Sequence, residues 1–116
     1  MMMKVIAIQI QPDRLPAFDE AAFIEWIEGI SSAEELIHSF EWVSGFDDGR
    51  YLNLKFESDR IPELWSKFRV MLYDDVRFGQ ALTVASIATC QGERGWDDYW
   101  LLYHFDPTQT LDIFNE

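Results

Sequence analysis

The apolar positions near the start of the chain follow two different spacings. Between residues 4 and 11, Ile6, Ile8 and Ile10 alternate with other side chains, which predicts an extended strand with these three on one face. In residues 16–28 the apolar positions recur every three or four residues, as on one side of an α-helix. We therefore expect a strand and then a helix.

Three residues near the end of this helix predict its last turn and the next element. Gly29 is expected to terminate the helix, since glycine readily adopts the left-handed conformation at a helix C-terminus. Ser31 and Glu34 have the spacing of a capping box, in which each side chain bonds the other's backbone amide. A second, short helical turn is expected from Ser31 to about Ile37.

Segments 40–46 and 50–57 are expected to form a β-hairpin closed by the turn Asp47-Asp48-Gly49. Asp-Gly is a strong hairpin signal because both residues tolerate the positive φ that tight turns require. In the second segment apolar residues alternate with polar ones. One apolar and one polar face indicate an antiparallel sheet that is covered on one side only.

The second half of the chain repeats this order with a helix and a hairpin. A helix is expected over residues 58–73, with Pro62 in its first turn, where its missing amide hydrogen does no harm. Strands are expected over 82–90 and 96–105, joined by a loop over 91–95 that contains two glycines.

The last predicted strand is largely apolar on both faces. Strict alternation divides its side chains between Tyr99, Leu101, Tyr103 and Phe105 on one face and Trp100, Leu102 and His104 on the other. Such a strand is either covered on both sides or presents aromatic side chains to a partner. Beyond it lies a polar tail over residues 107–116, for which the expected anchors are Leu111, Ile113 and Phe114.

The order of these elements predicts one α+β domain over residues 1–116. The expected architecture is a two-layer sandwich with the order β-α-β-β-α-β-β, in which two helices cover one face of a mainly antiparallel sheet. The first six elements have the order of a split βαβ (ferredoxin-like) unit, and the last strand extends it.

Charge adds a functional constraint to this fold class. The chain of 116 residues has a formal net charge of −12, together with 48% hydrophobic and 16% aromatic residues. Such a field repels the phosphates of nucleic acids and anionic membranes and attracts basic proteins. We therefore expect no direct nucleic-acid or membrane binding. Solubility alone is the simpler explanation of the charge.

The cysteine count and the hydropathy point to a compartment. Cys90 is the only cysteine, so an internal disulfide is impossible, as is usual in a reducing environment. No apolar run approaches the roughly 20 residues of a membrane span. These features predict a cytoplasmic protein.

Candidate catalytic and metal-binding residues are few. His38 and His104 lack Cys, Asp or Glu at a metal-binding spacing, and Asp106 could at most orient His104 as a general base. We interpret Cys90 as a buried structural thiol, because the negative charge of the protein would raise its pKa. The sequence therefore predicts no catalytic residues, no metal site and no cofactor.

A repeated acidic doublet is the feature with most functional content. Each doublet falls in or beside a predicted loop and next to aromatic residues, an arrangement that suits recognition of a basic protein surface. Aspartate is also a common turn residue, which is the structural alternative. The predicted partner-binding residues are Asp47, Asp48, Asp74, Asp75, Trp96, Asp97, Asp98 and Trp100.

In general character the chain resembles the small acidic immunity proteins that protect bacteria from toxins. The resemblance rests on the charge, the three aspartate doublets and the aromatic segment 96–105. It implies a non-enzymatic inhibitor that occludes a basic toxin. It includes no family motif.

Three alternatives remain open at this point. The acidic face could mimic nucleic-acid phosphates and block a protein that binds them. A dimeric α+β barrel could instead hold a small ligand or substrate in a pocket near His104, lined also by Trp42, Trp100 and Tyr103. Finally, the aromatic strand could be the interface of a homodimer.

Overall fold

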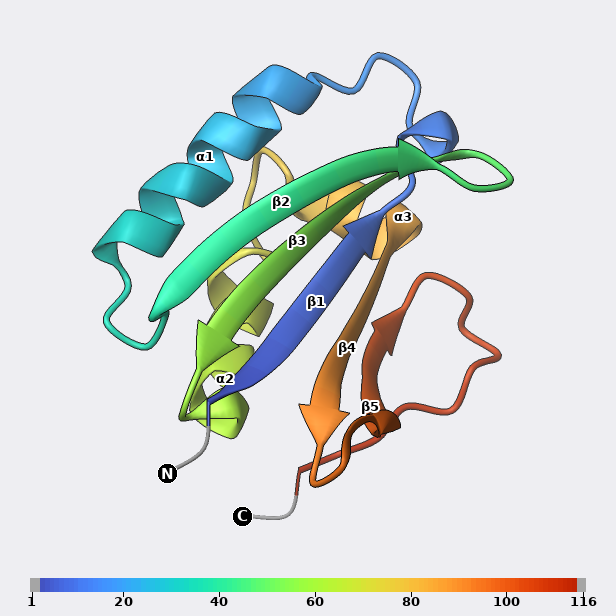
Figure 1. The fold of residues 1–116 in the computed structure, drawn as a ribbon. Helices are drawn as coiled ribbons and strands as arrows, with labels where there is room; N and C mark the ends of the chain where they lie inside the picture. The colour runs from blue at the N-terminus through green and yellow to red at the C-terminus, as the bar shows by residue number, and fades with distance from the viewer. Residues whose placement is uncertain (1–2, 115–116) are drawn as a thin grey trace.

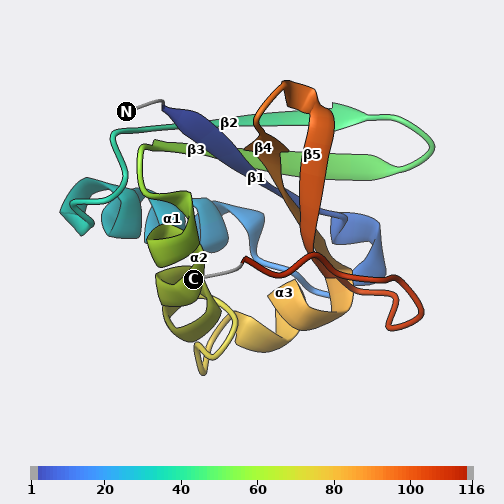
Figure 2. The same ribbon diagram turned by 90° about the horizontal axis from the view of Figure 1, so that it is seen from below.

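A computed structural model describes residues 3–114 and contains one five-stranded antiparallel sheet with three helices. All three helices lie on the same side of the sheet, and the other side has no covering layer (Figures 1 and 2). The fold is thus the predicted two-layer α+β sandwich. Residues 1–2 and the tail residues 115–116 of the predicted domain lie outside the described part.

The strand order is β2-β3-β1-β4-β5, and every neighbouring pair is antiparallel. In chain order the strands are β1 Lys4–Ile10, β2 Ser39–Phe46, β3 Arg50–Ser58, β4 Ser86–Gly92 and β5 Gly95–His104. Helix α1 connects β1 to β2, which lie on either side of β3 in the sheet. Helix α2 lies in the connection from β3 to β4, which lie on either side of β1. This is the interleaved split βαβ arrangement, with β5 added beside β4.

The core lies between the sheet and the helices. Alternation turns Ile6, Ile8 and Ile10 of the central strand β1 inward, and all three are fully buried. Aromatic rings join the layers, since Phe56 of β3 and Phe68 of α2 pack edge to face at 4.7 Å between ring centroids. The alternation in the sequence therefore predicted the buried face correctly.

Helix α1 spans Glu20–Ala33 and differs at both ends from the sequence-based expectation. Its start lies later, at the N-cap Asp19, whose carboxylate accepts the Ala22 amide hydrogen at 3.0 Å. Its end also lies later, because Gly29 is an internal helical residue. The expected turn that begins with a capping box at Ser31 does not form, since Ser31 belongs to the last turns of α1.

The connection from α2 to β4 contains a helix that we did not expect. Helix α2 spans Ile61–Met71, and a third helix, α3, spans Gly79–Ala85 before β4 begins at Ser86. The expected strand over 82–90 is therefore wrong in its first four residues. Leu82 and Ala85 are fully buried. Over so short a segment either a helix or a strand can bury two such residues, so the apolar pattern could not distinguish the two.

Strand β5 contains an irregularity that changes which side chains share a face. Ala88 lies opposite Tyr103, but the next residue, Thr89, lies opposite Leu101, so β5 has one extra residue at this point. Tyr103 therefore faces the helices together with Ala88, and Leu101 faces outward with Thr89. The predicted strict alternation is wrong here, because a bulge is a property of the pairing between strands.

The two outer edges of the sheet differ in what lies beside them. Along β5 the C-terminal segment is hydrogen-bonded to Leu101 through Asp112, and Phe114 stacks on Trp100 at 5.0 Å between ring centroids. Leu111 and Ile113 are exposed, so of the three expected anchors only Phe114 packs against the body. Strand β2 has no neighbouring strand on its outer side within residues 3–114.

Candidate functional site

The most distinctive surface is the face of the sheet opposite the helices, which we call the open face. Its side chains come from alternate positions of all five strands and are only partly buried by one another. The strand registers place the following residues side by side over three neighbouring strands: Val5, Ala7 and Gln9 of β1, Ile87 and Thr89 of β4, and Leu101 of β5.

Six neighbouring side chains over β1, β4 and β5 form an uncharged cluster on the open face, although the protein as a whole is strongly acidic. None of these six side chains is ionisable, but on the neighbouring strand β3 Lys55 lies opposite Ala7 and Glu57 lies opposite Val5. Lys55 also pairs across the strands with Glu41 of β2. The uncharged cluster has the composition of the core of a protein–protein interface, where charged residues are depleted, and Lys55 and Glu57 border it along β3. The sequence predicted a sheet that is covered on one side only, and the structure confirms it.

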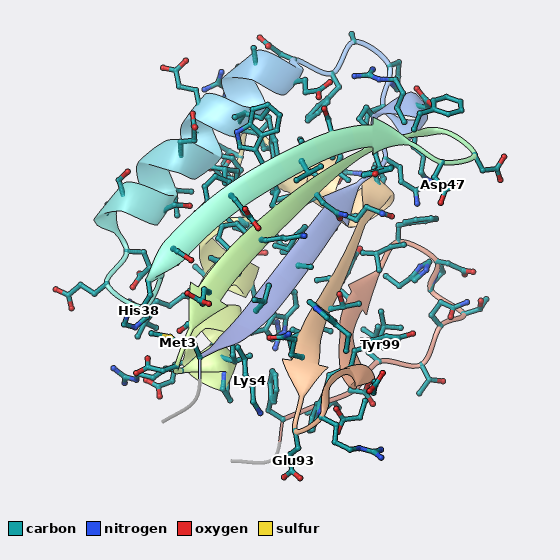
Figure 3. The ribbon with its side chains drawn as sticks, viewed as in Figure 1. Met3, Lys4, His38, Asp47, Glu93 and Tyr99 are labelled. Carbon is teal, nitrogen blue, oxygen red and sulfur yellow. The ribbon has the colours of Figure 1, made fainter. Side chains whose placement is uncertain are left out.

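Two of the three acidic doublets lie at opposite ends of this face. Asp47 and Asp48 form the tip of the β2–β3 hairpin, at the end of the sheet where β1 finishes. Asp97 and Asp98 begin β5, at the end where β1 starts. Figure 3 shows Asp47 at one end of the sheet and Tyr99, beside the second doublet, near the other.

The third doublet lies elsewhere. Asp74 and Asp75 belong to the connection between α2 and α3, on the helix side of the sheet. The structure therefore does not bring the predicted partner-binding residues together into one patch. It places Asp47, Asp48 and Asp97 around the open face and the α2–α3 doublet behind it.

Two of the six doublet aspartates have structural roles. The carboxylate of Asp98 accepts the backbone amide hydrogen of Arg94 at 2.8 Å and thereby closes the β4–β5 turn. The carboxylate of Asp75 accepts the amide hydrogens of Arg77 and Phe78, both at 2.8 Å, ahead of α3. These are the turn-forming roles for which aspartate is commonly selected. Only the remaining doublet carboxylates are available for a partner.

The aromatic residues beside the doublets also differ in whether they are exposed or packed inside. Trp96 and Tyr99 are 44% and 56% exposed, whereas Trp100 faces Cys90 and Phe114 on the helix side. Trp100 is therefore part of the packed interior and is not a surface anchor. A residue that sequence reasoning left out of the predicted set, Phe46, is 76% exposed next to Asp47.

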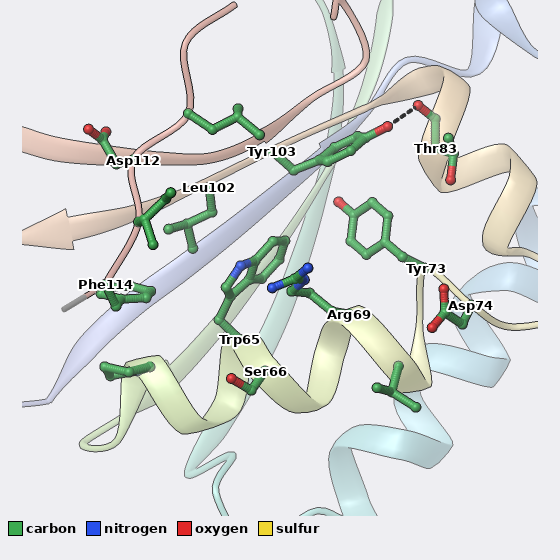
Figure 4. Close-up of a pocket in the computed structure, with 14 residues that line it drawn as sticks. Trp65, Ser66, Arg69, Tyr73, Asp74, Thr83, Leu102, Tyr103, Asp112 and Phe114 are labelled. Atoms are coloured by element: carbon green, nitrogen blue, oxygen red, sulfur yellow. Dashed lines mark hydrogen bonds between the residues drawn. The ribbon is translucent and has the colours of Figure 1, made fainter. Parts of the chain in front are cut away.

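A groove of about 890 Å³ lies on the helix side, between α2 and the C-terminal segment (Figure 4). Trp65, Tyr73 and Tyr103 form an aromatic wall, with ring centroids 5.7 Å apart for the first pair and 4.8 Å for the second. Its charged lining residues are Arg69, Asp74 and Asp112. Such a groove can hold an apolar group by contact.

The two tyrosine hydroxyl groups of this groove are already used in internal hydrogen bonds. Tyr103 donates to the Thr83 carbonyl at 2.5 Å, and the Tyr73 and Ser86 hydroxyls lie 2.7 Å apart. Burial raises the pKa of Tyr73 far above its ordinary value, so its phenol stays protonated at neutral pH. Neither tyrosine is therefore an activated nucleophile or base.

His104 does not belong to this groove. Its Nδ1 accepts the backbone amide hydrogen of Asp106 at 3.0 Å, so the carboxylate of Asp106 does not orient the ring in the way a catalytic dyad requires. Of the residues expected to line a pocket near His104, only Tyr103 lines the groove, whereas Trp42 and Trp100 do not.

The remaining candidates for chemistry are equally constrained. Cys90 is buried, and this burial raises the pKa of its thiol to about 11, so the thiolate is scarce at neutral pH. His38 bonds the carboxylate of Asp59 at 3.2 Å on the surface. Within residues 3–114, no three His, Cys, Asp or Glu side chains are grouped so that they could hold a metal ion.

Comparison with known proteins adds no family assignment. Searches against protein-family models, curated proteins and solved structures find no match for this chain. None of the helices in the described part of the chain is both long enough and apolar enough to cross a membrane.

Proposed function

We propose that this chain is a non-enzymatic binding protein that occludes a basic protein partner with the open face of its sheet, as a toxin-immunity or inhibitor protein does. The observation that supports it is the distribution of charge on that face. The uncharged cluster over β1, β4 and β5 lies between exposed carboxylates at the two ends of the sheet, Asp47 and Asp48 at one and Asp97 at the other. Along β3 it is bordered by Lys55 and Glu57.

Each part of this surface has a distinct physical role. The uncharged cluster over β1, β4 and β5 loses little hydration free energy when a partner covers it, because the cluster itself contains no charge that has to be buried. The exposed rings of Trp96 and Tyr99 provide large, rigid contact areas of the kind that dominates binding energy. The peripheral carboxylates attract a basic surface and accelerate encounter, an effect that salt weakens.

The proposed setting is the cytoplasm. The chain has a single cysteine, and its thiol is buried, which suits a protein that folds without disulfides in a reducing compartment. An inhibitor that acts there would encounter a toxin before the toxin reaches its target.

The proposal is tested by capture from a lysate of the native host on immobilised protein, at low and then moderate salt. Asp97→Lys changes the border of the open face, and Tyr99→Lys changes the face itself. Val70→Lys, on the exposed surface of α2, is the matched control. Asp98 is left unchanged because its replacement would disturb the turn.

We expect one basic protein to bind the wild type and the Val70→Lys control, and to be lost from both open-face variants. The purified partner should also lose its activity when the wild-type chain is added. Equal capture by all four proteins, or capture of nothing, would contradict the proposal. If instead the wild-type protein captures nothing and forms a dimer that Tyr99→Lys disrupts, the result would support the dimeric α+β barrel.

A further inference from the structure

Strand β2 is an unprotected edge of the sheet. It pairs with β3 on one side only, and six of its eight residues are exposed. Natural proteins usually protect such an edge with lysine, proline, a bulge or a covering segment. Ser39–Phe46 contains no lysine or proline, and its register with β3 is continuous. The opposite edge, β5, is covered by the C-terminal segment.

The backbone of β2 is oriented to accept another strand. The Asp47 amide donates to the Gly49 carbonyl at 2.9 Å, which identifies Phe46 and Arg50 as a non-hydrogen-bonded pair. Alternation then turns the backbone N–H and C=O groups of Phe40, Trp42, Ser44 and Phe46 away from β3. Four residues of β2 therefore present unpaired donors and acceptors outward.

The side chains along this edge offer apolar contacts on both of its faces. Val43, 45% exposed, belongs to the open face, whereas Trp42, 41% exposed, and Phe46 point to the helix side. Three of the large exposed apolar side chains of the protein thus come from one strand of eight residues. An added strand would cover them together.

The charges around the edge specify the kind of strand that fits. Glu41 lies on β2, Asp47 and Asp48 come directly after its end, and α1, which runs alongside β2 in Figure 1, exposes Glu25 and Glu28. The same carboxylates disfavour a second copy of this chain, because pairing two β2 strands would bring two acidic edges together. A segment with lysine or arginine side chains would be attracted instead.

We propose that an extended, basic segment of the partner adds to the sheet as a sixth strand beside β2. The inference rests on the proposed function, because it specifies how the same basic partner binds. Main-chain hydrogen bonds to β2 would supply affinity, and alternate basic side chains would meet the acidic surroundings. The added strand would be continuous with the open face, so one partner could cover both.

The probe that tests this is an octapeptide of alternating lysine and valine, blocked at both termini and as long as β2. One control peptide replaces lysine by glutamate, which reverses the charge and keeps the backbone. A second control N-methylates alternate amides, which keeps the charge and removes strand hydrogen bonding. The matched protein variants are Ser44→Pro, which removes one outward N–H, and Ser44→Ala, which retains it.

Binding is measured by titration, and hydrogen exchange reports the protection of individual β2 amides. We expect the lysine–valine peptide to protect the amides of Trp42, Ser44 and Phe46 in the wild type and in Ser44→Ala. The N-methylated peptide and the Ser44→Pro variant should each show affinity weaker by about tenfold or more. The glutamate peptide should not bind.

Three results would overturn strand addition. Equal binding of the plain and N-methylated peptides would show that charge alone attracts the segment, and the proposed function would survive. Capture of the native partner by Ser44→Pro as strongly as by Ser44→Ala would likewise exclude β2 while leaving the open face as its site. Self-association that Ser44→Pro abolishes would identify a second copy as the occupant.

Discussion

Asp112 and Leu101 are joined by a reciprocal pair of hydrogen bonds that attaches the C-terminal segment to the outer edge of β5. The Asp112 amide donates to the Leu101 carbonyl, and the Leu101 amide donates to Oδ2 of Asp112, both at 2.8 Å. These bonds occupy both outward backbone groups of Leu101. The segment therefore protects one edge of the sheet, while β2, at the other edge, stays open.

Replacing Asp112 by Ala removes the side-chain acceptor and should lower the free energy of unfolding by about 1 kcal/mol, the typical net value of one hydrogen bond. Urea unfolding measures this loss, and hydrogen exchange should show faster exchange at the Leu101 amide. Asp112→Asn retains an acceptor oxygen and is the control. An unchanged Leu101 exchange rate in Asp112→Ala would mean that the attachment is not maintained in solution.

Trp100 and Tyr99 are neighbours in β5 with opposite environments, which makes them a matched pair. Trp100→Ala should cost about 2–3 kcal/mol, somewhat less than the ~3–5 kcal/mol of a fully buried aromatic residue, because Trp100 is half-buried against Phe114. Tyr99→Ala should change stability by about 0.5 kcal/mol or less, since its ring is mostly exposed. Equal losses in thermal or urea unfolding would show that strand alternation does not place these two side chains in the opposite environments described.

Gly29 and Gly92 should respond in opposite directions to the same substitution. Gly29 lies inside α1 with no atom within 4 Å of an added Cβ, so Gly29→Ala should stabilise the protein by about 0.5–1 kcal/mol. At Gly92 an added Cβ would collide with the carbonyl oxygen of Asp98, and Gly92→Ala should destabilise it by about 1–3 kcal/mol. Calorimetric melting temperatures compare the two. Destabilisation by Gly29→Ala would show that the helix ends earlier.

Glu34 should contribute to the acid sensitivity of the fold. The Leu36 amide, at 3.0 Å, and the Lys67 ammonium, at 2.9 Å, hold the pKa of Glu34 below its ordinary value of 4.5. A lowered pKa in the folded state gives stability that is present above pH 4.5 and is lost as the pH falls through the folded-state pKa.

The variant Glu34→Gln tests this contribution by urea unfolding at a series of pH values. It should be less stable than the wild type at neutral pH, and the difference should shrink as the pH falls below 4.5. Glu35→Gln, at an exposed neighbouring position, is the control and should behave like the wild type. A stability difference that stays constant with pH would contradict the ionic role of Glu34.

The elements that the sequence determined are those whose signals are local. Ile6, Ile8 and Ile10 alternate with less apolar neighbours, and this pattern alone selects the buried face of β1. The Asp47-Asp48-Gly49 turn likewise specifies the first hairpin, because the positive φ of Asp48 and Gly49 is a requirement of the turn itself. The element order then restricts the architecture to a two-layer α+β sandwich.

Only the tertiary structure decided the features that depend on distant partners. Over residues 82–85 burial of Leu82 and Ala85 satisfies either a helix or a strand, and packing against the sheet selected the helix. The bulge in β5 exists only in relation to β4, so no pattern within residues 96–105 could place Tyr103 correctly.

One part of the candidate site follows from local sequence, and the other depends on the tertiary structure. Local sequence predicted acidic turns with aromatic neighbours, but the positions of those turns relative to one another are set by strand order. That order separates Asp47 from Asp97 by the length of the open face and puts Asp74 behind the sheet. The alternation over residues 50–57 already indicated a sheet covered on one side only. Which strand lies at the edge depends on pairing between segments far apart in the chain, which is why the free β2 edge appears only in the folded protein.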